Sequence, residues 1–188
     1  MSDKGSIIFG GRYELKKRIA RGGMAEVFLG EDQLLGRPVA VKVLFPEFAS
    51  DPNFVERFRR EAQAAANLSH PNIVGVFDWG KERNTYYIVM EYVEGRTLSQ
   101  IIRKEGSLPA ARVAEIADAI ASAVGFAHKG NVVHRDMKPG NVIISDNGQI
   151  KVADFGIATA ISTGSDTDLT QAGAVMGTAN YFSPEQAQ

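Results

Sequence analysis

The sequence predicts an α+β fold in two parts, a small strand-rich unit with one helix followed by a mostly helical unit. Two observations support this fold class. Short β-branched and apolar runs separated by glycine-containing turns dominate residues 12–91, which favours strands. Apolar residues at helical spacing dominate residues 96–188. We therefore expect a hinge at 92–95, and we interpret residues 1–11 as a flexible leader.

In the first unit, the pattern predicts strands that begin with an antiparallel three-stranded arrangement. The residues from Tyr13 alternate, and two apolar, β-branched runs follow at 27–30 and 39–44 with a glycine-containing turn between them. Further strands are expected at 73–79 and 86–91.

The one helix expected in this unit begins after Asp51, because Asp is a good N-cap and Pro52 suits the first helical position. Its apolar face is formed by residues at helical spacing, namely Phe54, Phe58, Ala62 and Ala65.

The second unit is predicted to begin with a helix over 98–104 that ends at Gly106, and a long helix follows up to Gly130. The apolar stripe of the long helix comprises Val113, Ile116, Ala117, Ile120, Val124 and Ala127. A hairpin is then expected, with strands at 142–145 and 150–153 on either side of an Asn-Gly turn. That hairpin places Asn141 and Asp154 at its open end.

The chemistry is concentrated in this region, where residues 133–141 read VHRDMKPGN and Asp154 begins an Asp-Phe-Gly sequence. The carboxylate of Asp136 can accept the proton of a substrate hydroxyl. Asn141 and Asp154 offer the oxygen ligands that Mg²⁺ prefers. Lys138 can stabilise the charge of a transferring phosphate. His134 is interpreted as a packed hydrogen-bonding group, because Asp136 already supplies a base.

A glycine-rich hairpin over residues 20–27 can fold its backbone amides over phosphate oxygens. Alone, this signal is weak, since glycine clusters are more often simple turns. A strand follows the cluster, which argues against a dinucleotide fold, and no Walker sequence occurs in the chain. Lys42 on the third strand and Glu61 in the helix strengthen the phosphate reading, because Glu61 could orient Lys42 toward α- and β-phosphates.

The order of these motifs resembles the eukaryotic-type serine/threonine protein kinases, and the bacterial branch with PASTA-linked receptor kinases most of all. Phrases at 58–62, 88–93 and 177–185 carry the same resemblance. It implies a bilobal kinase fold with ATP bound by a defined set of residues. That set comprises Ala20, Arg21, Gly22, Gly23, Met24, Ala25, Val27, Ala40, Lys42, Glu91, Val93 and Ile143. Adenine would lie between Val27, Ala40 and Ile143, and the backbone of Glu91 and Val93 would bond it.

The resemblance also implies the acceptor and its regulation. Lys138-Pro139 and Thr178, which would contact Asp136 and Lys138, indicate transfer to serine or threonine rather than tyrosine. Arg135 would receive an activation-loop phosphate, and we predict Thr170 as the principal autophosphorylation site. The implied cofactors are ATP and Mg²⁺, with Mn²⁺ as a substitute.

The sequence departs from the family in three places. Ala20 and Ala25 stand where glycine is usual, and Ser183 replaces an alanine. The family's large lobe continues through further helices after the Pro-Glu motif, so ending at Gln188 predicts an incomplete second lobe. The alternative readings are a nucleotide-binding or pseudokinase-like fragment and, more weakly, a kinase of small molecules.

Composition limits the partners. A net charge of -1 and a pI near 6.3 give no general reason to expect nucleic-acid binding. No apolar run reaches membrane-spanning length, so no membrane contact by this segment is expected. The absence of cysteine excludes disulfides and thiol catalysis and is compatible with a cytoplasmic location. Expected partners are protein substrates with serine or threonine and a second copy of the chain for autophosphorylation.

Overall fold

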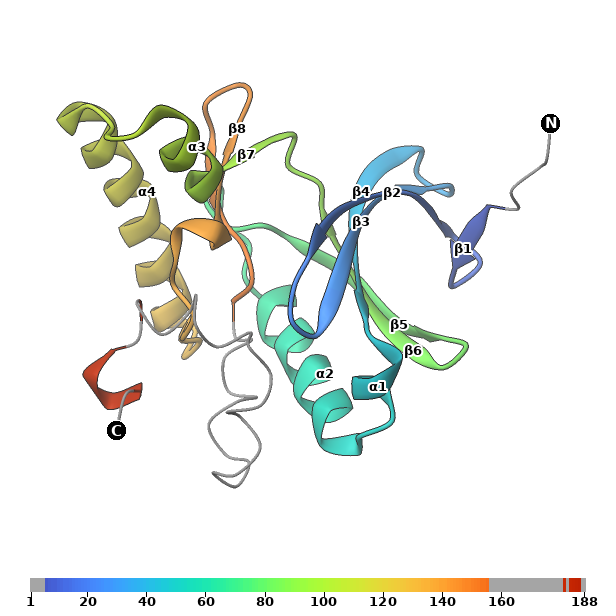
Figure 1. Ribbon diagram of the computed structural model, residues 1–188. Coiled ribbons are helices and arrows are strands. Elements are labelled where there is room, and N and C mark those ends of the chain that lie inside the picture. The colour runs from blue at the N-terminus through green and yellow to red at the C-terminus, as the bar shows by residue number, and fades with distance from the viewer. Residues whose placement is uncertain (1–5, 156–180, 182, 187–188) are drawn as a thin grey trace. The chain divides into compact units, whose positions relative to one another are not determined.

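The computed structural model describes residues 6–155, 181 and 183–186, and the chain divides into two compact units (Figure 1). The first unit comprises residues 1–66 and 75–92, and the second comprises 67–74 and 93–188. Residues 67–74 lie inside the range 12–91 expected for the first unit but group with the second unit. This segment belongs with the second unit because it pairs with strand β9 (Ile150–Val152), to which Val74 donates a backbone hydrogen bond of 2.9 Å.

The first unit is built on a six-stranded antiparallel sheet with the order β1-β2-β3-β4-β6-β5. Its strands are β1 (Ile7–Phe9), β2 (Tyr13–Arg21), β3 (Ala25–Asp32), β4 (Arg37–Leu44), β5 (Val76–Glu82) and β6 (Thr85–Glu91). The predicted antiparallel start is confirmed. The strand predicted at 73–79 begins later, at Val76, because the residues before it pair with β9 instead.

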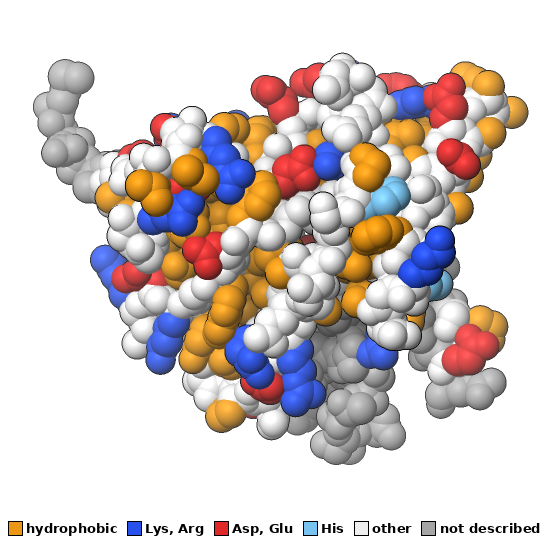
Figure 2. Space-filling model, turned by 180° about the vertical axis from the view of Figure 1, so that it is seen from behind, with side chains coloured by type: hydrophobic (Ala, Val, Ile, Leu, Met, Phe, Trp, Pro, Cys, Tyr) orange, Lys and Arg blue, Asp and Glu red, His pale blue; other side chains and the backbone are white. Residues whose placement is uncertain are grey.

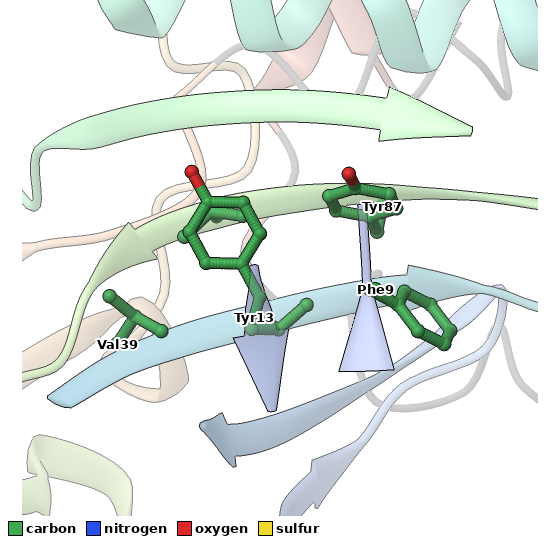
Figure 3. Close-up of a cluster of buried hydrophobic side chains, with 6 residues drawn as sticks. Phe9, Tyr13, Val39 and Tyr87 are labelled. Carbon is green, nitrogen blue, oxygen red and sulfur yellow. The ribbon is translucent and has the colours of Figure 1, made fainter. Parts of the chain in front are cut away.

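Strand β1 contradicts the flexible leader expected over residues 1–11, of which residues 6–11 are described. Phe9 is buried and meets the Tyr87 ring edge-on at 5.3 Å between centroids (Figure 3). Gly10 and Gly11 have positive φ values, which allows the tight turn into β2. Phe9 and Tyr87 share a core cluster with Tyr13 and Val39, so the free energy gained by burying Phe9 outweighs the entropy lost in ordering this short strand.

Two helices accompany this sheet. Helix α2 (Pro52–Ala66) was predicted, and the Asp51 carboxylate accepts the Asn53 N–H at 2.8 Å where the helix starts. The short α1 (Pro46–Ala49) was missed, since four residues carry no periodic signal. Helix α2 packs through Phe58 and Ala62 against one face of the sheet.

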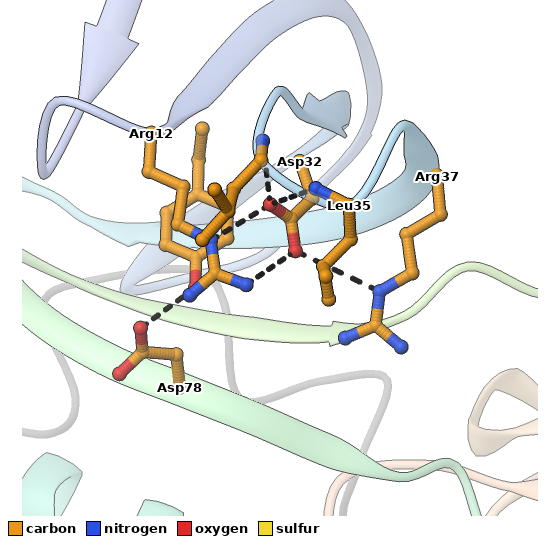
Figure 4. A network of polar contacts seen from close by, with 7 residues as sticks. Arg12, Asp32, Leu35, Arg37 and Asp78 are labelled. Atoms are coloured by element: carbon orange, nitrogen blue, oxygen red, sulfur yellow. Dashed lines mark hydrogen bonds and ion pairs between the residues drawn. The ribbon is translucent and has the colours of Figure 1, made fainter.

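Polar contacts hold the opposite side of the first unit (Figure 4). Arg12 donates to both carboxylate oxygens of Asp32 at 2.7 Å, and the Asp32 side chain is 0% exposed. The backbone N–H groups of Leu34 and Leu35 donate to the same carboxylate. These hydrogen bonds, led by the one from Arg12, lower the pKa of Asp32.

Where the structure describes it, the second unit combines a three-stranded antiparallel sheet with the α-helices α3 and α4. Its elements are β7 (Gly95–Thr97), α3 (Leu98–Glu105), α4 (Ala110–Lys129), the short 3₁₀ helix η1 (Pro139–Asn141), β8 (Val142–Ser145), β9 and the 3₁₀ helix η5 (Pro184–Gln186). The predicted ends of the helices at Gly106 and Gly130 are confirmed. Thr97 and Gln100 form a capping box that fixes the start of α3.

The buried face of α4 differs from the predicted stripe. Ile116 and Ala127 are buried together with Ala123, whereas Val113 is 50% exposed. A helical wheel cannot choose among several apolar residues, so the neighbouring sheet decides which of them are covered. Over the described ranges, no helix is both long and apolar enough to cross a membrane.

Figure 2 shows one surface of the molecule, on which basic and acidic side chains are interspersed with hydrophobic ones. This mixture agrees with the near-neutral charge of the sequence. On the face shown, neither sign of charge covers a large continuous area, which gives no support to a nucleic-acid surface there.

Candidate active site

The β8–β9 hairpin brings two predicted metal ligands to its open end. Val142 pairs with Val152, and the Ala153 N–H donates to the Asn141 carbonyl at 2.8 Å. Asp154 follows directly with a φ of 62°, in the left-handed region that non-glycine residues rarely adopt. Such a conformation persists only where the surroundings enforce it, and these positions are concentrated at functional sites.

Asp136 lies within a short polar cluster. Its Oδ2 accepts a hydrogen bond from Lys138 Nζ at 2.6 Å and one from Asn141 Nδ2 at 3.2 Å. Asn141 Nδ2 also donates to the Asp136 carbonyl at 2.8 Å. The Asp136 side chain is 15% exposed and that of Lys138 is 28% exposed, so both can still meet a substrate. The structure therefore brings together three of the predicted catalytic and metal-binding residues.

His134 fastens this cluster to the hairpin. It is buried, and its Nε2 lies 2.9 Å from the Ala153 carbonyl, while the Asp136 N–H donates to Nδ1 at 3.2 Å. Nδ1 must then be the bare nitrogen, and Nε2 carries the proton. Burial lowers the pKa of His134, which favours this neutral form. The ring also packs edge-on against Phe155. The packed role that the sequence indicated for His134 agrees with these contacts.

The donor atoms at the hairpin end suit a hard divalent cation. Because Asn141 Nδ2 is bonded to Asp136, its Oδ1 is the side-chain atom that can ligate a metal. With the Asp154 carboxylate it gives an all-oxygen pair, the type of ligand that Mg²⁺ prefers. Among the described residues, no group of three or more His, Cys, Asp or Glu side chains could hold a metal. Two protein oxygen ligands do not fill the six positions around Mg²⁺, so water or a ligand would supply the others.

The glycine-rich segment is a tight hairpin between β2 and β3. Arg21 pairs with Glu26, and the Gly22 N–H donates to the Ala25 carbonyl at 2.8 Å. Gly22 and Gly23 do not have positive φ values, and a Cβ added at Gly23 would meet nothing within 4 Å. The benefit of glycine here is the bare backbone that it offers to a ligand, rather than a special conformation.

One face of the six-stranded sheet carries the remaining first-unit residues. Val27 pairs with Lys42, and Ala40 lies two residues from Lys42 on the same strand and face. Lys42 and Ala40 are each 7% exposed. This is also the face against which α2 packs. Glu61 lies in α2, and its side chain is outside the part of the chain that the structure describes.

The other predicted nucleotide-binding residues occupy the ends of strands. Glu91 ends β6, where its N–H donates to the Gly75 carbonyl and its carboxylate accepts the Gly75 N–H. Val93 begins the second unit after β6, and Ile143 lies on β8 opposite Thr97. Gly156, Thr170 and Thr178 lie outside the described residues.

Sequence reasoning missed the segment that borders β9. Asn72 donates a side-chain hydrogen bond to the Ile150 carbonyl at 2.8 Å, and the buried Lys151 donates to the Ile73 carbonyl. The sequence signal was the polar His-Pro-Asn triplet, which comes directly before the strand predicted at 73–79.

The fold and these residues define a class of protein, and comparison with known proteins agrees. Residues 13–188 match the protein kinase domain family, so the chain belongs to that family. The kinase domain of Mycobacterium tuberculosis PknI has a similar structure, with a TM-score of 0.72 and 35% identity over 84% of this chain and 64% of that one. The predicted kinase fold is confirmed.

Two curated relatives make the comparison more specific. The chain is 50% identical to the serine/threonine-protein kinase PrkC of Bacillus subtilis, over 95% of the chain and 27% of the relative. It is 45% identical to the serine/threonine-protein kinase PknA of M. tuberculosis, over 100% of the chain and 44% of the relative. The chain thus spans less than half the length of either relative. Both names agree with the predicted kinase class and give no support to a non-catalytic fragment.

Proposed function

We propose that this chain carries the catalytic machinery of an ATP-dependent serine/threonine protein kinase, which transfers the γ-phosphoryl group of ATP to serine and threonine hydroxyls of proteins. The observation that carries the proposal is the Asp136 carboxylate held by Lys138 and Asn141 beside the hairpin end that bears Asp154. The names of the relatives support serine and threonine as acceptors.

The described geometry suits a simple in-line transfer. The substrate hydroxyl oxygen attacks the γ-phosphorus, its proton passes to Asp136, and the bond to the β,γ-bridging oxygen breaks to release ADP. Lys138, whose Nζ lies 2.6 Å from Asp136 Oδ2, can stabilise the charge of the transferring group. Asn141 fixes the orientation of the carboxylate. Asn141 and Asp154 would hold Mg²⁺, or Mn²⁺ in its place, and the ion would neutralise phosphate charge.

We assign the nucleotide to the residues named above. The backbone of the Ala20–Ala25 hairpin would cover the phosphates, and Lys42, oriented by Glu61, would bind the α- and β-phosphates. Adenine would contact Val27, Ala40 and Ile143, with backbone hydrogen bonds from Glu91 and Val93. The position of Lys42 supports this assignment, because it lies opposite Val27 and on the same strand and sheet face as Ala40.

Regulation by phosphorylation belongs to the same proposal. Thr170 would be modified by a second copy of the chain, Arg135 would receive the phosphate, and Thr178 would position the acceptor against Asp136. We expect a transient homodimer for this reaction. Cytoplasmic ATP as the phosphate donor implies a cytoplasmic location for the domain, whether or not a parent protein is anchored in a membrane.

The proposal is tested by measuring transfer from radiolabelled ATP to a protein substrate. The assay uses the 188-residue chain and, in parallel, the product of its complete reading frame. Asp136→Asn should abolish most transfer, whereas Asp146→Asn, an exposed aspartate of the hairpin turn, should leave it unchanged. If both forms of the protein were as inactive as their Asp136→Asn variants, the catalytic assignment would be wrong.

The phosphosite is tested separately by mass spectrometry of ATP-treated protein. Phosphate on Thr170, and its loss in the Asp136→Asn variant, is the expected result. A loop that stays unmodified in an active preparation would rule out Thr170 as the regulatory site.

A further inference from the structure

We infer that Asn72 is a positioning residue for Asp154, because it fastens the edge of the strand that leads into this acid. The inference rests on the proposed function, in which Asp154 is a metal ligand. It concerns only the second unit, to which both residues belong.

Strand β9 is only three residues long, and both of its edges are bonded. On one edge it pairs with β8. On the other edge Val152 donates to the Asn72 carbonyl at 2.8 Å, and Val74 donates to the Val152 carbonyl at 2.9 Å. Ile73 and Val152 thereby form a parallel bridge. This bridge extends the bonding of β9 beyond β8, and the strand pattern at 73–79 gave no indication of it.

The Asn72 side chain adds a further bond that sequence neighbours cannot supply. Its Nδ2 donates to the Ile150 carbonyl at 2.8 Å from a partly buried position. The residue is itself fixed, because its backbone N–H donates to His70 Nδ1 at 3.1 Å, and His70 Nε2 lies 3.2 Å from Ser122 Oγ on α4. Asn72 thus bonds the first and, through its backbone, the last residue of β9 and connects them to a helix.

The position of Asp154 depends on this strand. Only Ala153 separates Val152 from Asp154, and its backbone N–H and carbonyl are both bonded, to Asn141 and His134. A shift of β9 therefore has no flexible residue that could absorb it before it reaches Asp154. Partners that orient metal ligands commonly contribute about 10- to 100-fold to metal affinity or activity.

The experiment compares Asn72→Ala and Asn72→Asp with wild type. The aspartate has nearly the same shape but cannot donate to the Ile150 carbonyl, so it separates the hydrogen bond from the volume of the side chain. Gln33→Ala removes an exposed amide in the β3–β4 turn of the first unit and serves as the matched control. For each protein we would measure kcat, the Mg²⁺ concentration for half-maximal activity, and the KM for ATP at saturating Mg²⁺.

For both Asn72 variants we expect the half-maximal Mg²⁺ concentration to rise about tenfold, while the KM for ATP changes less than about twofold. The control should match wild type in every constant. A merely structural role would lower the amount of active protein and the unfolding midpoint but would leave the Mg²⁺ requirement unchanged. Folded Asn72 variants with a wild-type Mg²⁺ requirement would overturn the inference.

Two readouts that need no turnover separate this inference from the proposed function. Hydrogen exchange should be faster at the Val152 and Ala153 amides of the Asn72 variants, and Mn²⁺ binding in the presence of ADP, followed by electron paramagnetic resonance, should be weaker. If wild type transferred no phosphate, the proposed function would fail, yet these readouts would still decide the role of Asn72. Unchanged exchange and unchanged Mn²⁺ binding would reject it.

Discussion

Asp32 in the first unit and Asp136 in the second both accept hydrogen bonds from several donors. They differ in how fully these donors enclose the carboxylate. Asp32 is fully enclosed and is bonded by both arms of Arg12 and by two backbone N–H groups. Asp136 keeps 15% of its side chain exposed, and its Oδ2 meets one lysine and one amide. A carboxylate whose acceptors are all occupied can only hold structure, whereas a partly occupied one can still accept a proton.

The surroundings of the two aspartates also differ, since Asp32 is next to a packed core and Asp136 is in a loop. Asp32 lies near an aromatic core, where Tyr13 donates to Asp78 at 2.6 Å and burial raises the pKa of that phenol. Asp136 lies in a loop in which Arg135 has a φ of 64° and His134 is held as a neutral base. The first site is therefore a closed set of hydrogen bonds next to a core, whereas the second combines backbone strain with a partly exposed carboxylate.

The largest effect on activity is expected for Asp136→Asn, which tests whether Asp136 serves catalysis rather than stability. It removes the proton acceptor without changing the shape of the side chain, so kcat should fall by about 10²-fold or more. The unfolding midpoint should stay within about a degree of wild type, since no buried group loses a partner. Steady-state transfer from ATP and thermal unfolding followed by circular dichroism measure the two quantities. A large loss of stability would show that Asp136 is structural like Asp32.

For Asp32→Asn we expect the opposite result, a loss of stability without a loss of kcat. Asp32→Asn leaves the Arg12 guanidinium without its paired carboxylate, so we expect the unfolding midpoint to drop by several degrees while kcat per folded molecule stays within about twofold. Glu31→Gln, at an exposed neighbouring carboxylate, is the control and should change neither. Loss of kcat in folded Asp32→Asn protein would contradict the separation of the two sites.

A smaller effect should follow from pH through His134. Burial lowers the folded-state pKa below its ordinary value of about 6.5, so the unfolded chain binds more protons below that pH. The stability that neutral His134 contributes is present above about pH 6.5 and is lost as the pH falls below it. Thermal midpoints from pH 7 to 5 should fall less steeply in His134→Asn than in wild type. The exposed His128→Asn should keep the wild-type slope.

The smallest effect is expected at Glu56, an exposed carboxylate on α2 that pairs with Arg59 and Arg60. Hydrogen bonds from these arginines lower its pKa to about 2. Its contribution to stability is therefore present above about pH 4.5 and is lost as the pH falls toward 2. Exposed helical ion pairs contribute little, so Glu56→Gln should change the midpoint at pH 7 by about a degree or less. A fall in the unfolding midpoint as large as that of Asp32→Asn would mean that burial of a paired carboxylate does not increase its contribution to stability.

Much of the fold could be predicted from the sequence, because helix ends and tight turns depend on residues that are neighbours in the chain. The glycines after α3 and α4 end those helices, and the Asn-Gly turn defines the β8–β9 hairpin. Strand β1 and helix α1 were missed since each spans only three or four residues, too short for a periodic signal. The grouping of residues 67–74 with the second unit had no local signal, because the partner of Asn72 in β9 is 78 positions further along the chain.

The same division applies to the candidate site. The sequence by itself determined the chemistry, since an Asp, a Lys, an Asn and a second Asp at these spacings permit few reactions, and the order of motifs indicated the kinase family. Only the tertiary structure decided which contacts hold these groups. These contacts include the two hydrogen bonds that set the tautomer of His134, the bonds from Asn141 Nδ2 to Asp136, and the bond from Asn72 to the Ile150 carbonyl. Residue types fix which atoms can react, whereas hydrogen bonds between distant segments form only once the core has brought those segments together.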